Sequence, residues 1–363
     1  MITETASRLA AQMALVGADV LALAPTDSFR YAAGFSPFPD ERLCVLFVAQ
    51  GRAALVVPSI NAEDVRREAQ GVPLFEWKDG EDPEVALGRA ISDIGLNSDV
   101  TIAVDPEMRA DAALALQRAM PEARLVDGAA VLRPVREVKT ARELDLLISS
   151  ANTADMAMKS ALEACRHGAT EADVAASAVD GFRAAGVDSV SFTIIASGPN
   201  GAFPHHHTGN RKLVTGDAVV IDLGAKLAHY SSDLTRMAYL GEPSARYREV
   251  HAVVERACAV AIDAVRPGVT CGDIDSAARI TIAEAGFGDY FVHRTGHGMG
   301  LSMHEPPWIV LGSEEIVAEG MVFSIEPGIY LPGEFGIRLE DIVRVTMTGC
   351  EVLSGMSREL HVA

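Results

Sequence analysis

The sequence has little of what builds a disulfide framework or a zinc ribbon. Its five cysteines are an odd number, lie far apart and form no Cys-x-x-Cys pair. Secreted disulfide scaffolds and zinc ribbons use paired, closely spaced cysteines. The pattern therefore indicates reduced, mostly packed thiols and favours a cytoplasmic protein.

Positive charge is also scarce. The chain has 31 Lys and Arg against 50 Asp and Glu, which gives a net charge of −19. An acidic surface repels nucleic-acid phosphates and anionic lipid headgroups, so we expect neither nucleic acid nor a membrane as a partner. Clustered carboxylates also hold hard metal ions, so part of the acidity can belong to a metal site.

Targeting and membrane-spanning segments are not evident. The first five residues, Met-Ile-Thr-Glu-Thr, lack the basic and apolar regions of a secretory signal. The most apolar stretch, residues 43–60, is interrupted by Gln50-Gly51-Arg52 and by Pro58. It predicts two strands joined by a turn and not a membrane helix.

The length of 363 residues favours two domains. In residues 1–128, short apolar runs alternate with helical patterns, which predicts an α/β domain without an evident catalytic constellation. The expected elements are a helix over 84–94 and strands over 18–23, 44–49, 53–57 and 100–104. Residues 129–139, which contain Pro134, are expected to be a linker.

Residues 140–363 form the second expected domain, and they contain an internal repeat. A capping-box pattern, Thr140 to Glu143, predicts a long helix to about residue 166. The motif Gly-Ala-Thr-Glu-Ala-Asp at 168–173 has a counterpart, Gly-Val-Thr-Cys-Gly-Asp, at 268–273. Each motif opens a helical pattern that ends in Ala-Gly, at 185–186 and 285–286. We therefore expect two duplicated α+β units that frame a central cleft.

Two aspartates lie in apolar strand patterns. Asp222 interrupts a β-branched run over 218–225, and Asp233 lies in a second predicted strand over 230–240. On a long hairpin both side chains can point to one face, where they repel each other unless a cation lies between them. The alternative is a pair of solvated aspartates, which the apolar surroundings of Asp222 disfavour.

Two glutamates repeat this pattern near the C-terminus. Glu326 ends an apolar strand over 321–328, and Glu340 shares a face with Arg338 in a predicted strand over 336–343. The alternatives are a capping role for Glu326 and a simple ion pair between Glu340 and Arg338.

Candidate site histidines occur in three places. His297 lies between glycines in Gly-His-Gly-Met-Gly, which allow close backbone approach to a ligand or a partner, and His304 follows shortly after. The run His205-His206-His207 follows a turn; such a run is usually a solvated loop in which at most one member is chemically active.

Two Asp, two Glu and one His form a set of hard ligands. Such a set suits two Mn²⁺, Co²⁺ or Fe²⁺ ions better than one zinc held by thiolates. Two metals can share and deprotonate a water molecule and polarise a carbonyl, so this set of residues indicates a hydrolase.

These motifs resemble those of the pita-bread metallopeptidases, the family of methionine aminopeptidase, aminopeptidase P, prolidase and creatinase. They occur in the family's order over about residues 135–360, and Phe29-Arg30-Tyr31 with Gly34-Phe35 resembles the creatinase/prolidase N-terminal module. The carrying segments are 221–225, 230–236, 296–301, 304–307, 324–328 and 338–341. The resemblance implies an α/β N-terminal domain followed by an α+β pita-bread catalytic domain with pseudo-twofold duplication.

The resemblance also implies the role of each site residue. Asp222 would bind one metal, His297 and Glu326 the other, while Asp233 and Glu340 would bridge both. Glu326 would also be the general base toward a metal-bridging water. His205 and His304 would hydrogen-bond the scissile carbonyl or the developing oxyanion. Arg338 would orient Glu340 or bind a substrate carboxylate.

Two departures from the family pattern leave these ligands intact. His206 and His207 replace the residues usually found after the first histidine and are expected to be solvated. Met237 replaces a threonine, which we interpret as a packing change.

The resemblance predicts a metallopeptidase that cleaves the bond before proline, in Xaa-Pro dipeptides or at longer N-termini. Two divalent ions are expected, with Mn first and Co, Fe or Zn as alternatives, and the protein is expected to form a homodimer. The other enzyme hypothesis is a metal-dependent amide hydrolase of a non-peptide small molecule, like ectoine hydrolase. A non-catalytic binding protein is disfavoured because all five ligands are present.

Overall fold

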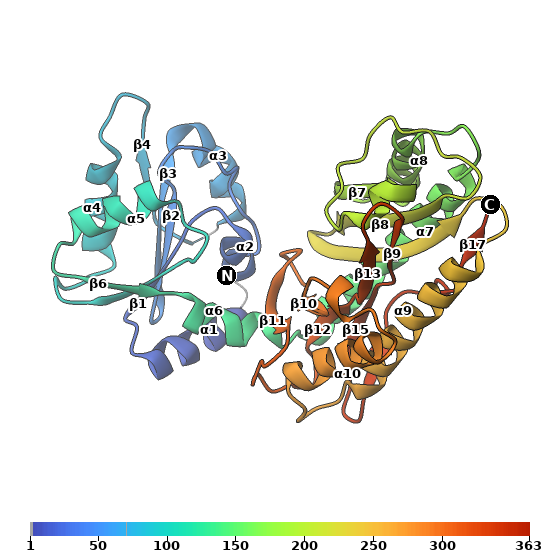
Figure 1. The fold of residues 1–363 in the computed structure, drawn as a ribbon. Helices are drawn as coiled ribbons and strands as arrows, with labels where there is room; N and C mark the ends of the chain where they lie inside the picture. The colour runs from blue at the N-terminus through green and yellow to red at the C-terminus, as the bar shows by residue number, and fades with distance from the viewer. Residues whose placement is uncertain (1–2, 70) are drawn as a thin grey trace. The chain divides into compact units, whose positions relative to one another are not determined.

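The structure is a computed structural model that describes residues 3–69 and 71–363. The chain divides into two compact units, Met1–Arg136 and Glu137–Ala363, called here the N-terminal and C-terminal units (Figure 1). Much of the expected linker is helical, because α6 spans Ala129–Glu137 with Pro134 inside it. Within the described residues, no helix has both the length and the apolar character needed to cross a membrane.

The N-terminal unit is built on a six-stranded sheet in the order β4-β3-β2-β1-β5-β6. The four strands expected from the sequence are present as β1, β2, β3 and β5, and the helix expected over 84–94 is α4. The strands are β1 Val20–Leu23, β2 Val45–Ala49, β3 Arg52–Pro58, β4 Leu74–Trp77, β5 Thr101–Val104 and β6 Arg124–Asp127. The helices are α1 Thr3–Val16, α2 Asp27–Ala33, α3 Ser59–Glu68, α4 Pro83–Asp93 and α5 Ala110–Ala119.

The C-terminal unit contains the predicted repeat. Its α-helices are α7 Ala141–Ala164, α8 Glu171–Ala184, α9 Ala245–Ala264 and α10 Cys271–Glu284, and its short 3₁₀ helices are η1 Gly198–Ala202 and η2 Gly288–Tyr290. Thr140 begins α7 with the expected capping box, and Thr170 and Thr270 begin α8 and α10 with capping boxes of the same kind. In each box the threonine accepts from a backbone N–H and the acidic residue accepts from the threonine N–H, which fixes the helix start.

Three sheets complete the C-terminal unit. A four-stranded sheet has the order β17-β9-β8-β7, a five-stranded sheet has the order β11-β10-β12-β15-β16, and β13 pairs with β14. The strands of the first sheet are β7 Ser189–Ser197, β8 Ala218–Leu227, β9 Tyr230–Tyr239 and β17 His361–Val362. The others are β10 Gly296–Gly298, β11 Glu305–Ile309, β12 Val322–Ile325, β13 Gly328–Leu331, β14 Phe335–Arg338, β15 Asp341–Val345 and β16 Cys350–Val352.

The expectation of a single strand over 336–343 is wrong. The chain forms two strands there, β14 and β15, which belong to different sheets, and Glu340 lies between them. The Glu340 N–H donates instead to the Thr235 carbonyl of β9 at 3.3 Å. This change of partner ends the first strand. The expected strand over 321–328 is likewise divided, into β12 and the start of β13.

Strands β8 and β9 separate two apolar cores. Alternate residues on β8, among them Ile221 and Leu223, pack with α7 and α8, whereas Val220 packs on the opposite face with α9 and α10. Because side chains alternate along a strand, Asp222 shares the face of Val220. The two cores thus hold the β8–β9 hairpin rigidly and present one of its faces to the site.

Candidate metal centre

Two of the expected ligands come from the β8–β9 hairpin. Asp222 is paired in register with Thr235, and Asp233 with Gly224, so the two aspartates lie diagonally on one face. Both side chains are buried. Strand register therefore brings the two carboxylates together, as the sequence pattern predicted.

Glu340 reaches the same place from the junction between β14 and β15. Its carboxylate accepts a hydrogen bond from the Thr235 hydroxyl at 2.7 Å. The buried guanidinium of Arg236 holds the backbone on both sides, donating to the Glu340 carbonyl at 2.6 Å and the Thr235 carbonyl at 2.9 Å. It also pairs with Asp341. The strand break thus points the Glu340 carboxylate at the two aspartates.

Arg338 pairs with Asp222 and not with Glu340. The guanidinium donates to the Asp222 carboxylate and, at 2.8 Å, to the Tyr330 hydroxyl. A third hydrogen bond goes to the Thr235 hydroxyl at 3.3 Å. Of the two roles expected for Arg338, this geometry favours orienting a ligand, although the ligand is Asp222.

His297 enters from β10, where its flanking glycines allow the strand to pack closely. A Cβ atom on Gly296 would lie 1.8 Å from the Ser324 carbonyl oxygen, and one on Gly298 would lie 2.2 Å from the Pro306 carbonyl oxygen. The His297 Nδ1–H donates to the Gly298 carbonyl at 3.1 Å. This bond leaves the Nε2 lone pair free to coordinate a metal, the usual arrangement for a ligating histidine.

Glu326 follows β12 and lies beside His297. Its carboxylate accepts from the Ser324 hydroxyl at 3.0 Å, and that hydroxyl accepts from the His297 N–H at 3.0 Å. The His297 Nε2 lies 3.4 Å from Glu326 Oε1 and 3.9 Å from Asp233 Oδ2. Neighbouring strands thus fix the imidazole and the carboxylate relative to each other.

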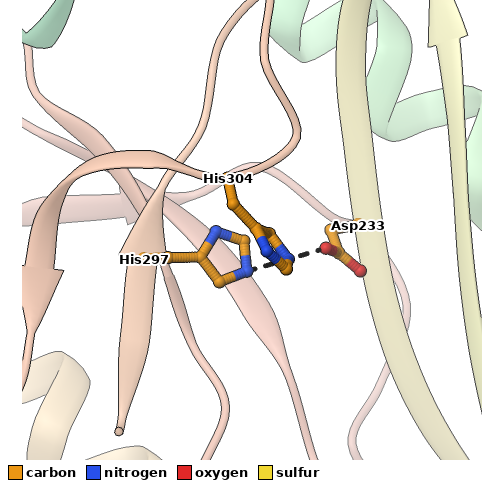
Figure 2. Close-up of side chains that lie close together, drawn as sticks. All are labelled: Asp233, His297 and His304. Atoms are coloured by element: carbon orange, nitrogen blue, oxygen red, sulfur yellow. Dashed lines mark ion pairs between the residues drawn. The ribbon is translucent and has the colours of Figure 1, made fainter. Parts of the chain in front are cut away.

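The structure brings all five expected ligands together. Two groups of three have ligand atoms within 4.8 Å of one another, and they share Glu340: His297 with Glu326 and Glu340, and Asp222 with Asp233 and Glu340. His304 joins Asp233 and His297 in a third such group, which Figure 2 shows with both imidazoles beside the Asp233 carboxylate. The two imidazole rings are 4.0 Å apart at their centres.

Three carboxylates of this cluster, those of Asp233, Glu326 and Glu340, have raised pKa values when no cation is present. Burial and the neighbouring carboxylates raise the pKa of Asp233 and of Glu340 well above the usual range. Burial also raises the pKa of Glu326 to about 7, although Arg338 opposes the shift. Burial lowers the pKa of His297 to about 3, so its imidazole is neutral. Such shifts show that one arginine does not balance the buried negative charge.

These residues fit divalent metal ions. Among the described residues, Asp222 Oδ1 and Asp233 Oδ1 are buried oxygens without a hydrogen-bond partner. A buried carboxylate oxygen without a partner is costly, and a coordinated cation removes that cost. Four carboxylates and one neutral imidazole form a hard donor set, as Mn²⁺ and similar ions prefer.

The cluster lies in a cavity of about 740 Å³. The two other expected site histidines, His205 and His304, line this cavity and are exposed. The remaining lining residues are the five ligands, Phe192, Ile194, Pro204, His293, Arg294, Met303 and Arg338. A small peptide therefore has room beside the carboxylate cluster.

Several residues in or near this cavity were not found from the sequence. Tyr330 accepts from Arg338, and His293 Nε2 lies 2.8 Å from the Tyr330 hydroxyl. Arg294 lies over the Trp308 ring at 4.3 Å. The proximity of His293 and Arg294 to His297 in the sequence was the available signal. Tyr330 and Trp308 gave none, because an aromatic residue in a strand usually belongs to the core.

His206 differs from its expected solvated state. Its side chain is only 18% exposed, and its Nε2 lies 2.9 Å from the carboxylate of Glu171, which is fully buried. His207 is exposed. Sequence reasoning had treated the two residues alike.

Comparison with known proteins indicates the same family as the sequence motifs. The model of the Creatinase/Prolidase N-terminal domain matches residues 6–138, and that of Metallopeptidase family M24 matches residues 145–347. The chain therefore belongs to metallopeptidase family M24. Its fold is the expected creatinase-like α/β domain followed by a pita-bread catalytic domain.

The similarity extends over nearly the whole chain. The chain is 39% identical to a probable dipeptidase PepE of Mycobacterium tuberculosis over 97% of its own length and 94% of the relative's. It is 34% identical to an Xaa-Pro dipeptidase of Pyrococcus horikoshii over 94% of each. A crystal structure of a prolidase from Thermococcus sibiricus superposes with a TM-score of 0.94 at 33% identity, covering 99% of this chain and 98% of that one.

Proposed function

We propose that this protein is a dinuclear metallopeptidase that hydrolyses Xaa-Pro dipeptides. The observation that carries the proposal is the buried cluster of five expected ligands at the wall of a peptide-sized cavity, with two aspartate oxygens that have no partner among the described residues. The similarity to Xaa-Pro dipeptidases supports the choice of substrate.

Asp222, Asp233, His297, Glu326 and Glu340 hold two divalent ions in this proposal, with manganese as the first choice. When bound, the ions would supply a water molecule of lowered pKa and would polarise the scissile carbonyl. Glu326 accepts the proton of the attacking water, since a general base must lie within hydrogen-bond reach of the proton it removes. His205 and His304, on the cavity wall, donate hydrogen bonds to the carbonyl oxygen as negative charge develops there.

The two guanidinium groups that line the cavity have different roles in this proposal. Arg338 is engaged with Asp222 and Tyr330. Arg294 lies over the Trp308 ring, and burial lowers the pKa of Arg294 although Glu326 opposes the shift. Because a guanidinium matches a carboxylate in shape and charge, we assign the C-terminal carboxylate of a dipeptide to Arg294.

A panel of substrates tests the proposal. Metal-stripped protein is assayed with Xaa-Pro dipeptides, Xaa-Pro-Yaa tripeptides and dipeptides without proline, before and after addition of Mn²⁺ or Co²⁺. Metal-dependent cleavage that prefers Xaa-Pro dipeptides is expected. Preference for tripeptides would indicate aminopeptidase activity, and two bound metals with no peptide cleavage would favour a non-peptide amide substrate.

The Arg294 assignment has its own test. Arg294→Leu is expected to raise the KM for an Xaa-Pro dipeptide more than the KM for the same dipeptide with an amidated C-terminus. An equal rise in KM for both substrates would show that Arg294 does not bind the substrate carboxylate.

We also propose a homodimer, on the basis of the family alone. Sedimentation equilibrium of the full chain is expected to give twice the chain mass of 38.4 kDa. A mass equal to one chain at micromolar concentration would contradict it.

A further inference from the structure

The loop that carries His205 is tied to a carboxylate outside the metal centre. Glu171, the first residue of α8, has a relative exposure of 0%. Its Oε1 accepts from the Ser197 N–H at 2.8 Å, the Ser197 hydroxyl at 2.7 Å and the Asn200 amide at 2.9 Å. Its Oε2 accepts from His206 at 2.9 Å and the Gly209 N–H at 3.1 Å. These donors lie on both sides of His205 in the chain.

The carboxylate is ionised in this setting. Burial opposes ionisation, but hydrogen bonds from Asn200, Ser197 and His206 outweigh it and hold the pKa of Glu171 below its usual range. An ionised carboxylate only accepts, so His206 must donate through its Nε2–H. Hydrogen bonds to a buried charged acceptor are stronger than neutral ones, which makes Glu171 an effective anchor for the loop.

The internal repeat shows that the helix start does not need this carboxylate. In α10 the position of Glu171 is occupied by Cys271, yet the capping box at Thr270 is the same. The backbone pairing is also the same: Glu171 N donates to the Arg211 carbonyl at 3.1 Å, and Cys271 N donates to the Glu315 carbonyl at 2.8 Å. The Glu171 side chain therefore adds contacts to Ser197 at the end of β7 and to the loop of residues 198–209, not to the start of α8.

We propose that Glu171, acting through His206, Asn200 and Ser197, is a positioning residue that holds the loop of residues 198–209 so that His205 faces the metal centre. The inference rests on the proposed function, since it assigns the loop to hydrolysis. His206, which is half-buried against Glu171, is one of the contacts that hold the loop, whereas its neighbour His205 lines the cavity.

Glu171→Gln tests the positioning role of Glu171, because glutamine has nearly the same shape as glutamate. A glutamine keeps one acceptor oxygen but turns an NH₂ group toward donors on its other side, so the loop loses contacts on that side. We expect kcat for an Xaa-Pro dipeptide to fall roughly 10- to 100-fold, because a misplacement of about 1 Å costs on the order of 100-fold. The number of bound metal ions should stay that of the wild type. Asp173→Asn, which weakens the capping box of the same helix, is the matched control and should retain the wild-type kcat.

A double-variant cycle separates positioning from general destabilisation. If Glu171 acts through His205, then Glu171→Gln lowers kcat little further in the His205→Ala background. His206→Leu, at the half-buried end of the contact, should show a smaller loss in the same direction and serves if Glu171→Gln does not fold. The proposal would be overturned if the kcat losses of Glu171→Gln and His205→Ala multiplied fully in the double variant. It would also be overturned if Glu171→Gln and His206→Leu both kept the wild-type kcat.

Amide hydrogen exchange tests the loop without using activity. Exchange of residues 198–209 should be faster in Glu171→Gln than in wild type and unchanged in Asp173→Asn. This result would hold even if no peptide were cleaved, so failure of the proposed function is distinguishable from failure of the inference. Unchanged exchange in Glu171→Gln would refute the positioning role.

Discussion

Arg338 donates a hydrogen bond to Asp222 from β14, the strand that ends just before Glu340. The same guanidinium binds the Tyr330 hydroxyl, which lies 2.8 Å from His293. One carboxylate oxygen of Asp222 is thus engaged by Arg338, while Oδ1 has no partner among the described residues. The arginine therefore orients one oxygen of the ligand and leaves the other for a metal ion.

Arg338→Lys should weaken metal binding without unfolding the protein. A lysine keeps the positive charge but cannot contact Asp222, Tyr330 and Thr235 together. Loss of a group that orients a metal ligand typically costs about 10- to 100-fold in metal affinity or activity. Isothermal titration calorimetry with the metal ion measures the metal affinity of both variants. Arg344→Lys, which alters an exposed pair with Glu351, is the control.

Asp233→Ala should abolish hydrolysis and reduce the bound metal. The structure places Asp233 Oδ2 3.9 Å from His297 Nε2 and its carboxylate in a group with Asp222 and Glu340, so under the proposed function it would help to hold both ions. Metal content by mass spectrometry and turnover of an Xaa-Pro dipeptide are measured together. Asp180→Ala, an exposed carboxylate on α8, should leave both unchanged. Near-wild-type turnover with two bound ions in Asp233→Ala would refute the site.

Gly296→Ala tests whether close strand packing positions His297. The added methyl would meet the Ser324 carbonyl oxygen at 1.8 Å, so β10 must move away from β12 and carry the imidazole with it. We expect the variant to lose metal affinity and to unfold at lower temperature, because overpacking costs typically about 1–3 kcal/mol. Gly88→Ala, where a methyl meets nothing within 4 Å in α4, should retain metal binding.

Lys139→Met should destabilise the C-terminal unit. The Lys139 ammonium lies 3.0 Å from Glu305, and the two side chains are 1% and 6% exposed. Removing the ammonium takes this ion pair away from the buried Glu305 carboxylate, and breaking a buried ion pair costs about 3–5 kcal/mol in other proteins. Urea denaturation measures the change. The double variant Lys139→Met with Glu305→Leu should recover part of the loss, whereas equal instability of both variants would contradict a pairing role.

The parts of the site that were predictable from sequence lie in strands with clear alternation. The apolar run around Asp222 and the second strand around Asp233 fixed a common face, and the structure places both carboxylates there. The structure places Glu340 beside the other expected ligands, although the strand expected around it was wrong, because two-residue periodicity does not reveal a change of sheet partner. Glu171 escaped notice since an acidic residue at a helix start usually interacts with the helix dipole. Its role depends on a loop that approaches only in the folded chain.

His251, away from the metal centre on α9, should make the protein sensitive to acid. Burial lowers the pKa of this imidazole, although Glu255 opposes the shift, and its Nε2 has no partner among the described residues. The unfolded chain therefore binds a proton at a higher pH than the folded chain, and the free energy of unfolding falls as the pH drops below the ordinary value of 6.5. Each unit of difference in pKa corresponds to about 1.4 kcal/mol.

His251→Phe removes this titration. Its free energy of unfolding, measured by urea denaturation at pH 8 and at pH 5, should therefore fall less between the two pH values than that of the wild type. His361→Phe, at a partly exposed histidine in β17, is the matched control and should lose as much as the wild type. An equal loss for wild type and His251→Phe would show that His251 does not carry the acid response.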